Sequence, residues 1–176
     1  MQNGDMQVVV ARSRAKSLAC LAGCALFVAA SLAIIAQGSA LTLIVGVVGV
    51  LTFVGFGIGW IVILLRSGPG LVLDETGFDD TSSLAAVGRV LWADVTRVSE
   101  LTVRWTSFVV IGVRDPQLYL GRLRGLPRIA AIANNRLFGS PVIITAVSLK
   151  ISFTSLSILL AEGLRRYHEP WLEIPT

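Results

Sequence analysis

Two long stretches without a charged residue dominate the first part of this chain. Residues 18–36 and residues 41–65 contain no Asp, Glu, Lys or Arg. A helix needs about 20 apolar residues to cross the hydrocarbon core of a bilayer, and both stretches approach or exceed that length. Backbone groups in lipid must bond within their own segment, so each stretch is expected to be helical. We therefore predict a transmembrane hairpin of two helices with a short loop.

The basic residues around the hairpin predict its orientation. Three of them precede the first stretch within residues 12–16, Arg66 follows the second, and the loop at 37–40 is uncharged. Basic flanks stay on the cytoplasmic side, so both ends of the chain are expected there. Residues 1–17 are then a cytoplasmic segment of a multi-pass inner (plasma) membrane protein.

A cleaved signal peptide is the alternative interpretation of the first stretch. Gly38-Ser39-Ala40 offers small residues for cleavage, which would remove residues 1–40. The apolar run is longer than the roughly 7–15 residues usual in a signal peptide. The hairpin remains the favoured interpretation, and under the alternative the second stretch would be the only anchor.

Glycine is frequent in the second stretch. Gly55 and Gly59 form a G-x-x-x-G pair, and Ala19 and Gly23 form a similar pair of small residues in the first stretch. Such pairs let helices approach closely. They could pack the hairpin on itself, or they could bind another membrane protein or a second copy of this chain.

The charge of the remaining sequence argues against nucleic-acid binding. Residues 67–176 carry eleven basic and ten acidic residues. A nucleic-acid-binding domain would concentrate basic residues on its folded surface. The excess of positive charge instead flanks the hairpin, so no nucleic-acid partner is expected.

Alternation of apolar and polar residues predicts short antiparallel strands after the breaker cluster at 67–70. The turn at 74–77 and the alternation from Leu101 to Val113 both indicate hairpins. The strands expected with them are 71–73, a return strand from Phe78, 101–106, 109–113, 140–145 and 147–152.

Three further helices are expected in this region. Asp115-Pro116 is a favourable helix start for residues 117–124. Residues 127–138 follow, closed by Gly139, and leucines at helical spacing mark a terminal helix at 155–170. That last helix would cover the open end of a curled sheet.

The segment Leu91-Trp92-Ala93-Asp94-Val95 carries a family resemblance. It is similar to an Ile-Pro-Trp-x-Asp-Ile pattern typical of bacterial pleckstrin-homology-like domains, although Leu91 replaces the proline. Arg114-Asp115-Pro116 and the stretches 134–141 and 149–152 add to the likeness. With its two apolar stretches, the chain resembles a family of small bacterial membrane proteins of unknown function with two N-terminal transmembrane helices and a pleckstrin-homology-like cytoplasmic domain.

The resemblance covers nearly the whole chain and implies a membrane α+β fold. A two-helix transmembrane hairpin would precede residues 70–170, a pleckstrin-homology-like curled antiparallel sheet or barrel capped by a C-terminal helix. The family carries no agreed catalytic residues. In this fold, Trp92 is expected to anchor a turn into the sheet, and Asp94 is expected to cap the turn that follows.

No residues suggest catalysis, a metal or a cofactor. His168 is the single histidine, so a two-histidine metal motif is excluded, and no phosphate-binding glycine loop ending in Gly-Lys-Ser/Thr is present. The acidic pairs Asp74-Glu75 and Asp79-Asp80 are expected to be solvated turn residues. Cys20 and Cys24 are interpreted as packing residues.

One basic cluster remains as a candidate site. Arg122, Arg124, Arg128 and Arg136 lie among leucines and isoleucines with no acidic residue nearby. The cluster could contact the membrane surface or an acidic partner, or it could be an ordinary solvated helix face.

The favoured function is therefore a non-enzymatic inner-membrane protein that presents an interaction domain at the cytoplasmic face. Its partners would be the lipid bilayer and either a membrane protein or a second copy of the chain. The alternative is an accessory subunit of a membrane transport or envelope assembly that docks through the glycine-rich second stretch. An unrecognised enzyme is the least favoured class.

Overall fold

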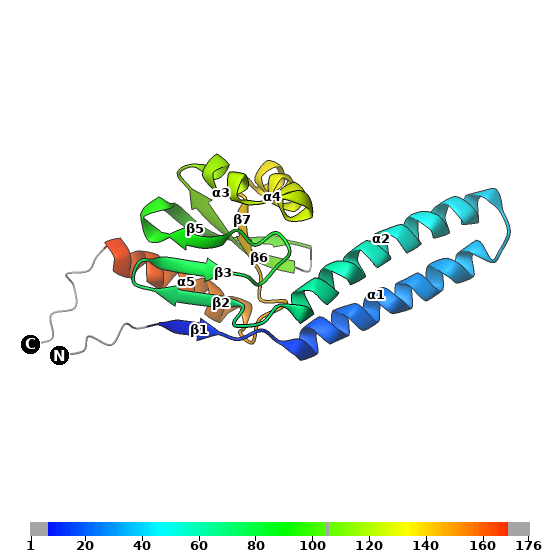
Figure 1. Ribbon diagram of the computed structural model, residues 1–176, viewed down its shortest axis with the longest axis horizontal. Coiled ribbons are helices and arrows are strands. Elements are labelled where there is room, and N and C mark those ends of the chain that lie inside the picture. Colours follow the sequence, from blue (N-terminus) through cyan, green and yellow to red (C-terminus); the bar gives the residue numbers. More distant parts are fainter. Residues whose placement is uncertain (1–6, 105, 169–176) are drawn as a thin grey trace, which may run out of the picture. The chain divides into compact units, whose positions relative to one another are not determined.

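The computed structural model describes residues 7–104 and 106–168, and the chain divides into two units (Figure 1). One unit is the helical segment 13–67, called the hairpin below. The other, called the β-rich domain, combines residues 7–12 with residues 68–104 and 106–168. The predicted domain at 70–170 therefore lacked an N-terminal piece, and its last residues, Glu169 and Pro170, lie outside the described part.

The hairpin consists of α1 (Arg14–Ile35) and α2 (Ala40–Leu65). Both helices are long and apolar enough to cross a membrane by length and composition. Helix α2 begins with reciprocal bonds between Ser39 and Thr42, in which each side chain accepts from the other's backbone N–H. The two predicted helices are confirmed, with α1 starting four residues before the apolar stretch.

The hairpin helices pack through small residues and one aromatic pair. The rings of Phe27 and Phe53 stack with their centroids 4.4 Å apart. A Cβ added at Gly46 would lie 2.7 Å from the carbonyl oxygen of Ser31, so only glycine permits this approach. Gly49 likewise faces the Ser31 side chain.

The β-rich domain contains two antiparallel sheets. Alternation in the sequence predicted the antiparallel pairing, but as a single curled sheet or barrel. The four-stranded sheet has the order β1 (Val8–Val10), β2 (Leu71–Asp74), β3 (Gly77–Asp80) and β4 (Gly88–Leu91). The three-stranded sheet has the order β5 (Val95–Val103), β6 (Thr106–Val113) and β7 (Val142–Ile144).

Strand β1 comes from the segment that we expected to be only a membrane flank. Val8 pairs with Leu73 and Val10 pairs with Leu71. Val10 is buried in the domain core, whereas Val8 and Val9 are exposed. The N-terminal residues are thus an edge strand of the domain.

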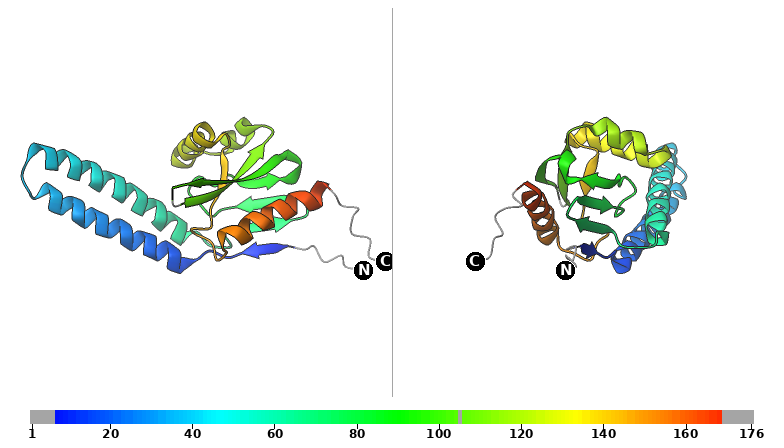
Figure 2. Two further views of the ribbon diagram at one scale, coloured as in Figure 1. Left: turned by 180° about the vertical axis from the view of Figure 1, so that it is seen from behind. Right: turned by 60° about the vertical axis from the view of Figure 1, so that its left-hand side comes forward.

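The helices of the domain lie on different sides of the strands (Figure 2). A short 3-10 helix, η1 (Trp92–Asp94), joins the two sheets, and α3 (Pro116–Arg122) and α4 (Gly125–Phe138) join β6 to β7. Helix α5 (Phe153–His168) follows and packs on β5, β6 and η1. All three predicted helices of this region are confirmed.

One core is shared by the strands and α5. Its largest fully buried side chains include Trp92, Tyr119, Phe78, Leu71, Ile111, Ile144, Leu149, Leu156 and Leu160. Because α5 contributes two of these leucines, it closes the domain core as the sequence predicted.

The strand expected at 147–152 is wrong. Val147 N–H bonds the side chain of Thr145 and Leu149 N–H bonds Ala146 O, so this segment turns. Among the described residues, its β-pairing is limited to one isolated bridge between Leu149 and Arg12, beside which Lys150 N–H donates to Ala11 O at 2.9 Å. The alternation arose because Leu149 enters the core while Ser148 bonds Ser82 O.

Candidate functional site

Helices α3 and α4 have well-defined ends. The Asp115 carboxylate accepts from the backbone N–H of Gln117 at 2.9 Å and also from Leu118, and Pro116 occupies the first turn. Gly139 ends α4 with φ 75°, a left-handed conformation that glycine adopts without strain. The sequence predicted both features.

Arg122 is held against the domain. Its guanidinium donates to the carbonyl oxygen of Arg89 at 3.0 Å and lies 4.8 Å from the centre of the Tyr119 ring. The position over an aromatic face is favourable for a cation. This arginine therefore has a packing role that distinguishes it from the other three members of the predicted cluster.

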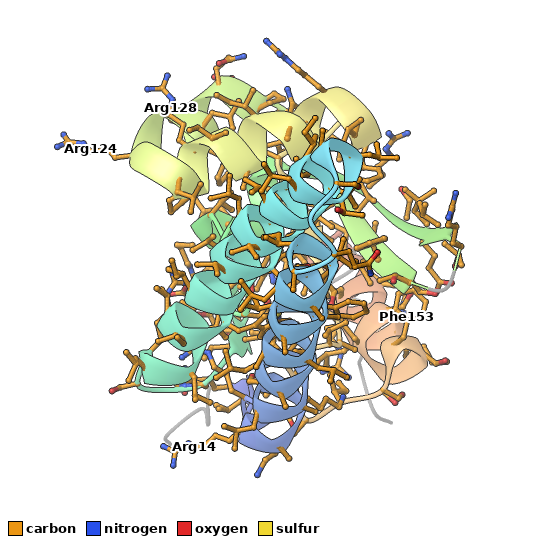
Figure 3. The ribbon with its side chains drawn as sticks, turned by 90° about the vertical axis from the view of Figure 1, so that its right-hand side faces the viewer. Arg14, Arg124, Arg128 and Phe153 are labelled. Carbon is orange, nitrogen blue, oxygen red and sulfur yellow. The ribbon has the colours of Figure 1, made fainter. Side chains whose placement is uncertain are left out.

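Arg124, Arg128 and Arg136 are exposed and carry uncompensated positive charge. Their side chains form no hydrogen bond or ion pair with other residues in the described part of the chain. No Asp or Glu occurs in the sequence between Asp115 and Glu162. Figure 3 shows Arg124 and Arg128 pointing away from the ribbon.

Apolar side chains occupy the outward side of α4. Leu126 is 56% exposed, Ile129 is 65% exposed and Leu137 is 74% exposed. With exposed Ala133 they are spaced three or four residues apart, so they line one side of the helix. Ala131, which is buried, lies on the inward side of the helix.

Phe138 belongs to the inward side of α4. Its ring lies 5.9 Å from that of Phe108 on β6, and α4 also packs on β7. We use the name "α4 outer face" for the surface made by Leu126, Ile129, Ala133 and Leu137 together with Arg124, Arg128 and Arg136. It combines a row of apolar side chains with unpaired cations, which suits binding to an apolar, negatively charged surface.

Trp92 anchors the corner between the sheets, as predicted. It is 1% exposed, its indole N–H donates to Asp74 O at 3.0 Å, and its ring lies 5.2 Å from that of Phe78. A Cβ added at Gly163 of α5 would overlap the indole ring. The corner and α5 are therefore closely packed together.

Asp94 has a different role from the predicted turn cap. Its carboxylate accepts a hydrogen bond from the Tyr119 hydroxyl at 2.8 Å, which ties α3 to η1. Burial, together with this carboxylate, raises the pKa of Tyr119 to about 12. The phenol therefore stays protonated and remains a donor across the physiological range.

The two acidic pairs behave differently from each other. Asp74 is a turn residue as predicted: it accepts from the backbone of Thr76 and Gly77. The bidentate bond from Arg89 holds the pKa of Asp74 well below its usual range. Asp80 is not a solvated turn residue: it is 1% exposed, and burial raises its pKa to about 6.

No metal-binding group is formed by the described residues, where no three His, Cys, Asp or Glu side chains come together. His168 lies exposed at the end of α5, beside the ring of Tyr167. Cys20 and Cys24 are free thiols on α1.

The glycine pair Gly55 and Gly59 lies partly away from the contact between α1 and α2. Gly55 is exposed, and a Cβ added there would have no described atom within 4 Å. Gly59 is half-buried. The close contact forms at Gly46 and Gly49 instead, so Gly55 leaves a small exposed site on α2.

No protein-family model, curated protein or solved structure matches this chain. The candidate site is thus defined by its own residues. Sequence reasoning found the arginines of α4 and the leucines between them. It left open whether the leucines point outward, because periodicity shows that a helix has an apolar side but not which way that side faces.

Proposed function

We propose that this chain is an integral protein of the bacterial inner membrane that presents a non-enzymatic interaction domain at the cytoplasmic face. The α4 outer face, exposed on a domain connected to two apolar helices, is the observation that carries the proposal. Soluble monomers rarely leave a contiguous apolar surface of this kind unless something binds it.

The orientation rests on charge. Arg14 and Lys16 lie in the first turn of α1, before its uncharged stretch, Arg66 follows α2, and the loop between the helices has no charged residue. The positive-inside rule then puts both termini in the cytoplasm, with the helices as a multi-pass anchor.

A pleckstrin-homology-like fold is part of the same proposal. The order of a four-stranded and a three-stranded antiparallel sheet, followed by α5 against the open side, supports it. So does the buried Trp92 at the corner between the sheets. Helices α3 and α4 are an addition between β6 and β7, and we propose that they form the contact surface of the domain.

The alternative function is an accessory subunit of a membrane transport or envelope assembly that docks through α2. Exposed Gly55 is the observation that favours it, because the α1–α2 contact does not use that position.

Photo-crosslinking in native membranes, from Arg128 and from Gly55, separates the two functions. Ile158, which is 63% exposed on α5, is the control position. Specific protein or lipid adducts from Arg128 alone support the interaction domain, and protein adducts from Gly55 alone support the assembly subunit. If neither position gives more adducts than Ile158, both functions are contradicted.

A further inference from the structure

We propose that the α4 outer face lies on the surface of an anionic bilayer, with its apolar side chains among the headgroups. This inference rests on the proposed function, which holds the domain beside the membrane, and it names the partner of that domain.

The residue pattern of α4 fits a helix that lies in the plane of a membrane interface. Such helices combine a row of Leu, Ile or Phe with Lys or Arg beside it. In α4, Leu126, Ile129 and Leu137 form the exposed row. At 3.6 residues per turn, Arg136 lies beside this row, whereas exposed Arg128 lies on the flank of the first turn, about 100° around the helix from Ile129. Arg124 adds a third cation just before the helix begins.

The charge of the surface selects an anionic partner. Residues 116–161 contain no side-chain carboxylate, so nothing in this segment opposes Arg124, Arg128 and Arg136, which have no partner among the described residues. Each basic residue near anionic headgroups should raise the ratio of membrane-bound to free α4 by about fivefold. A neutral bilayer would offer only the apolar contribution.

The connections to the hairpin keep α4 within reach of a bilayer. Only residues 11–13 join β1 to α1, and only residues 66–70 join α2 to β2. At about 3.5 Å per extended residue, the longer connection spans ~20 Å at most. An anchored hairpin therefore holds the domain at a high effective concentration near the headgroups, which lets a single short helix bind measurably.

A protein partner is the competing occupant. The apolar row lies on the outward side of a single helix, and four successive apolar positions can enter a lipid interface without a matching groove. The uncompensated positive charge matches a continuous anionic surface, so we favour the bilayer.

Spin-label accessibility in the full-length chain tests the inference directly. The label is attached to Ile129→Cys in a Cys20→Ala/Cys24→Ala background, and the control label to Ile158→Cys on α5. The two isoleucines are 65% and 63% exposed, so neither substitution disturbs the core. The chain is reconstituted in vesicles of phosphatidylcholine alone or of phosphatidylcholine mixed with phosphatidylglycerol.

In anionic vesicles we expect the label at 129 to be accessible to oxygen and shielded from an aqueous nickel reagent, whereas the label at 158 stays open to the nickel reagent. The Arg124→Gln/Arg128→Gln/Arg136→Gln variant should lower the ratio of membrane-bound to free α4, read from the label at 129, by about fivefold per arginine. The control variant Arg165→Gln/Arg166→Gln, on α5, should leave the label at 129 unchanged.

Equal nickel accessibility at 129 and 158 in anionic vesicles would overturn the inference, as would shielding at 129 that is the same in neutral vesicles. If 129 is open to nickel in vesicles while Arg128 crosslinks to a protein in native membranes, the bilayer inference fails and the interaction domain stands. Loss of every specific crosslink from Arg128 would instead count against the proposed function itself.

Discussion

Helices α4 and α5 belong to the same domain and have similar sequence patterns, yet they use their apolar sides in opposite ways. In α5, Leu156 and Leu160 are fully buried in the core. In α4 only Ala131 is buried, Phe138 is half-buried against Phe108, and Leu126, Ile129 and Leu137 face outward. The apolar side of α5 thus stabilises the domain core. The apolar row of α4 is exposed and contributes little to that core.

The arginines of the two helices differ in the same way. Arg165 and Arg166 of α5 both bond Glu162, and these bonds lower the pKa of that carboxyl group to about 2. Arg128 and Arg136 of α4 have no such acidic neighbour among the described residues. The apolar side and the arginines of α5 are used within the domain. In α4, the exposed apolar row and the arginines are available to a partner.

The corner that holds α5 should give the largest loss of stability. Trp92→Ala removes a fully buried indole that packs on Phe78 and against Gly163, and we expect the free energy of unfolding to fall by about 3–5 kcal/mol. Thermal unfolding of the detergent-solubilised chain measures this. Trp92→Phe should lose less, and an unchanged melting temperature for Trp92→Ala would contradict the structural role.

A leucine pair compares the two helices directly. Leu160→Ala in α5 should lower the free energy of unfolding by about 2–5 kcal/mol, because it leaves a cavity in the core. Leu137→Ala in α4 should change it by no more than about 0.5 kcal/mol, because that side chain is 74% exposed. Chemical denaturation in detergent gives both values, and equal losses would show that α4 packs as α5 does.

Lowering the pH should strengthen the core while leaving the α4 arginines charged. The pKa of Asp80 is raised to about 6, so the folded state binds this proton more tightly than the unfolded state does. The stabilisation is complete below pH ~4 and is lost as the pH rises through 6. Arg12 and Asp79 are the charged groups that act on it.

Comparison with Asp80→Asn isolates this effect from other carboxylates. Relative to that variant, the wild-type free energy of unfolding should rise by about 2 kcal/mol between pH 7 and pH 4. Unfolding curves at several pH values measure the difference. A difference that stays constant with pH would mean that Asp80 is not buried.

The bond that ties α3 to the corner should give a smaller loss of stability than the changes at Trp92, Leu160 and Asp80. Tyr119→Phe removes the donor to Asp94 and should cost about 1 kcal/mol, since the carboxylate is only half-buried. Tyr167→Phe, at an exposed position on α5, is the matched control and should be neutral. If Tyr167→Phe lowered the free energy of unfolding more than Tyr119→Phe does, the stabilising role of the Tyr119–Asp94 bond would be contradicted.

The sequence predicted the elements whose signals are local. The uncharged stretches marked α1 and α2, Asp115-Pro116 and Gly139 marked the ends of the α3–α4 pair, and leucine spacing marked α5. Strand β1 was missed, because three valines in front of a basic flank give no pattern long enough to recognise. Its pairing with Leu71 and Leu73 is a long-range contact.

The candidate site was predicted only in part, for the same reason. The arginines were visible in the sequence, but nothing local showed that Arg122 would fold back onto Tyr119 while the others have no partner in the described part of the chain. Asp80 looked like its neighbour Asp79, yet one is buried and the other half-buried. Which side of an element faces the core depends on the assembled fold.

The side of the membrane on which α4 and α5 lie is the central claim, and thiol labelling in intact cells tests it most directly. In the Cys20→Ala/Cys24→Ala background, Gln37→Cys lies in the loop between α1 and α2, and Ile158→Cys lies exposed on α5. A membrane-impermeant maleimide should label Gln37→Cys in intact cells and Ile158→Cys only after the membrane is permeabilised. Labelling of both positions in intact cells would contradict a cytoplasmic domain held by a transmembrane hairpin.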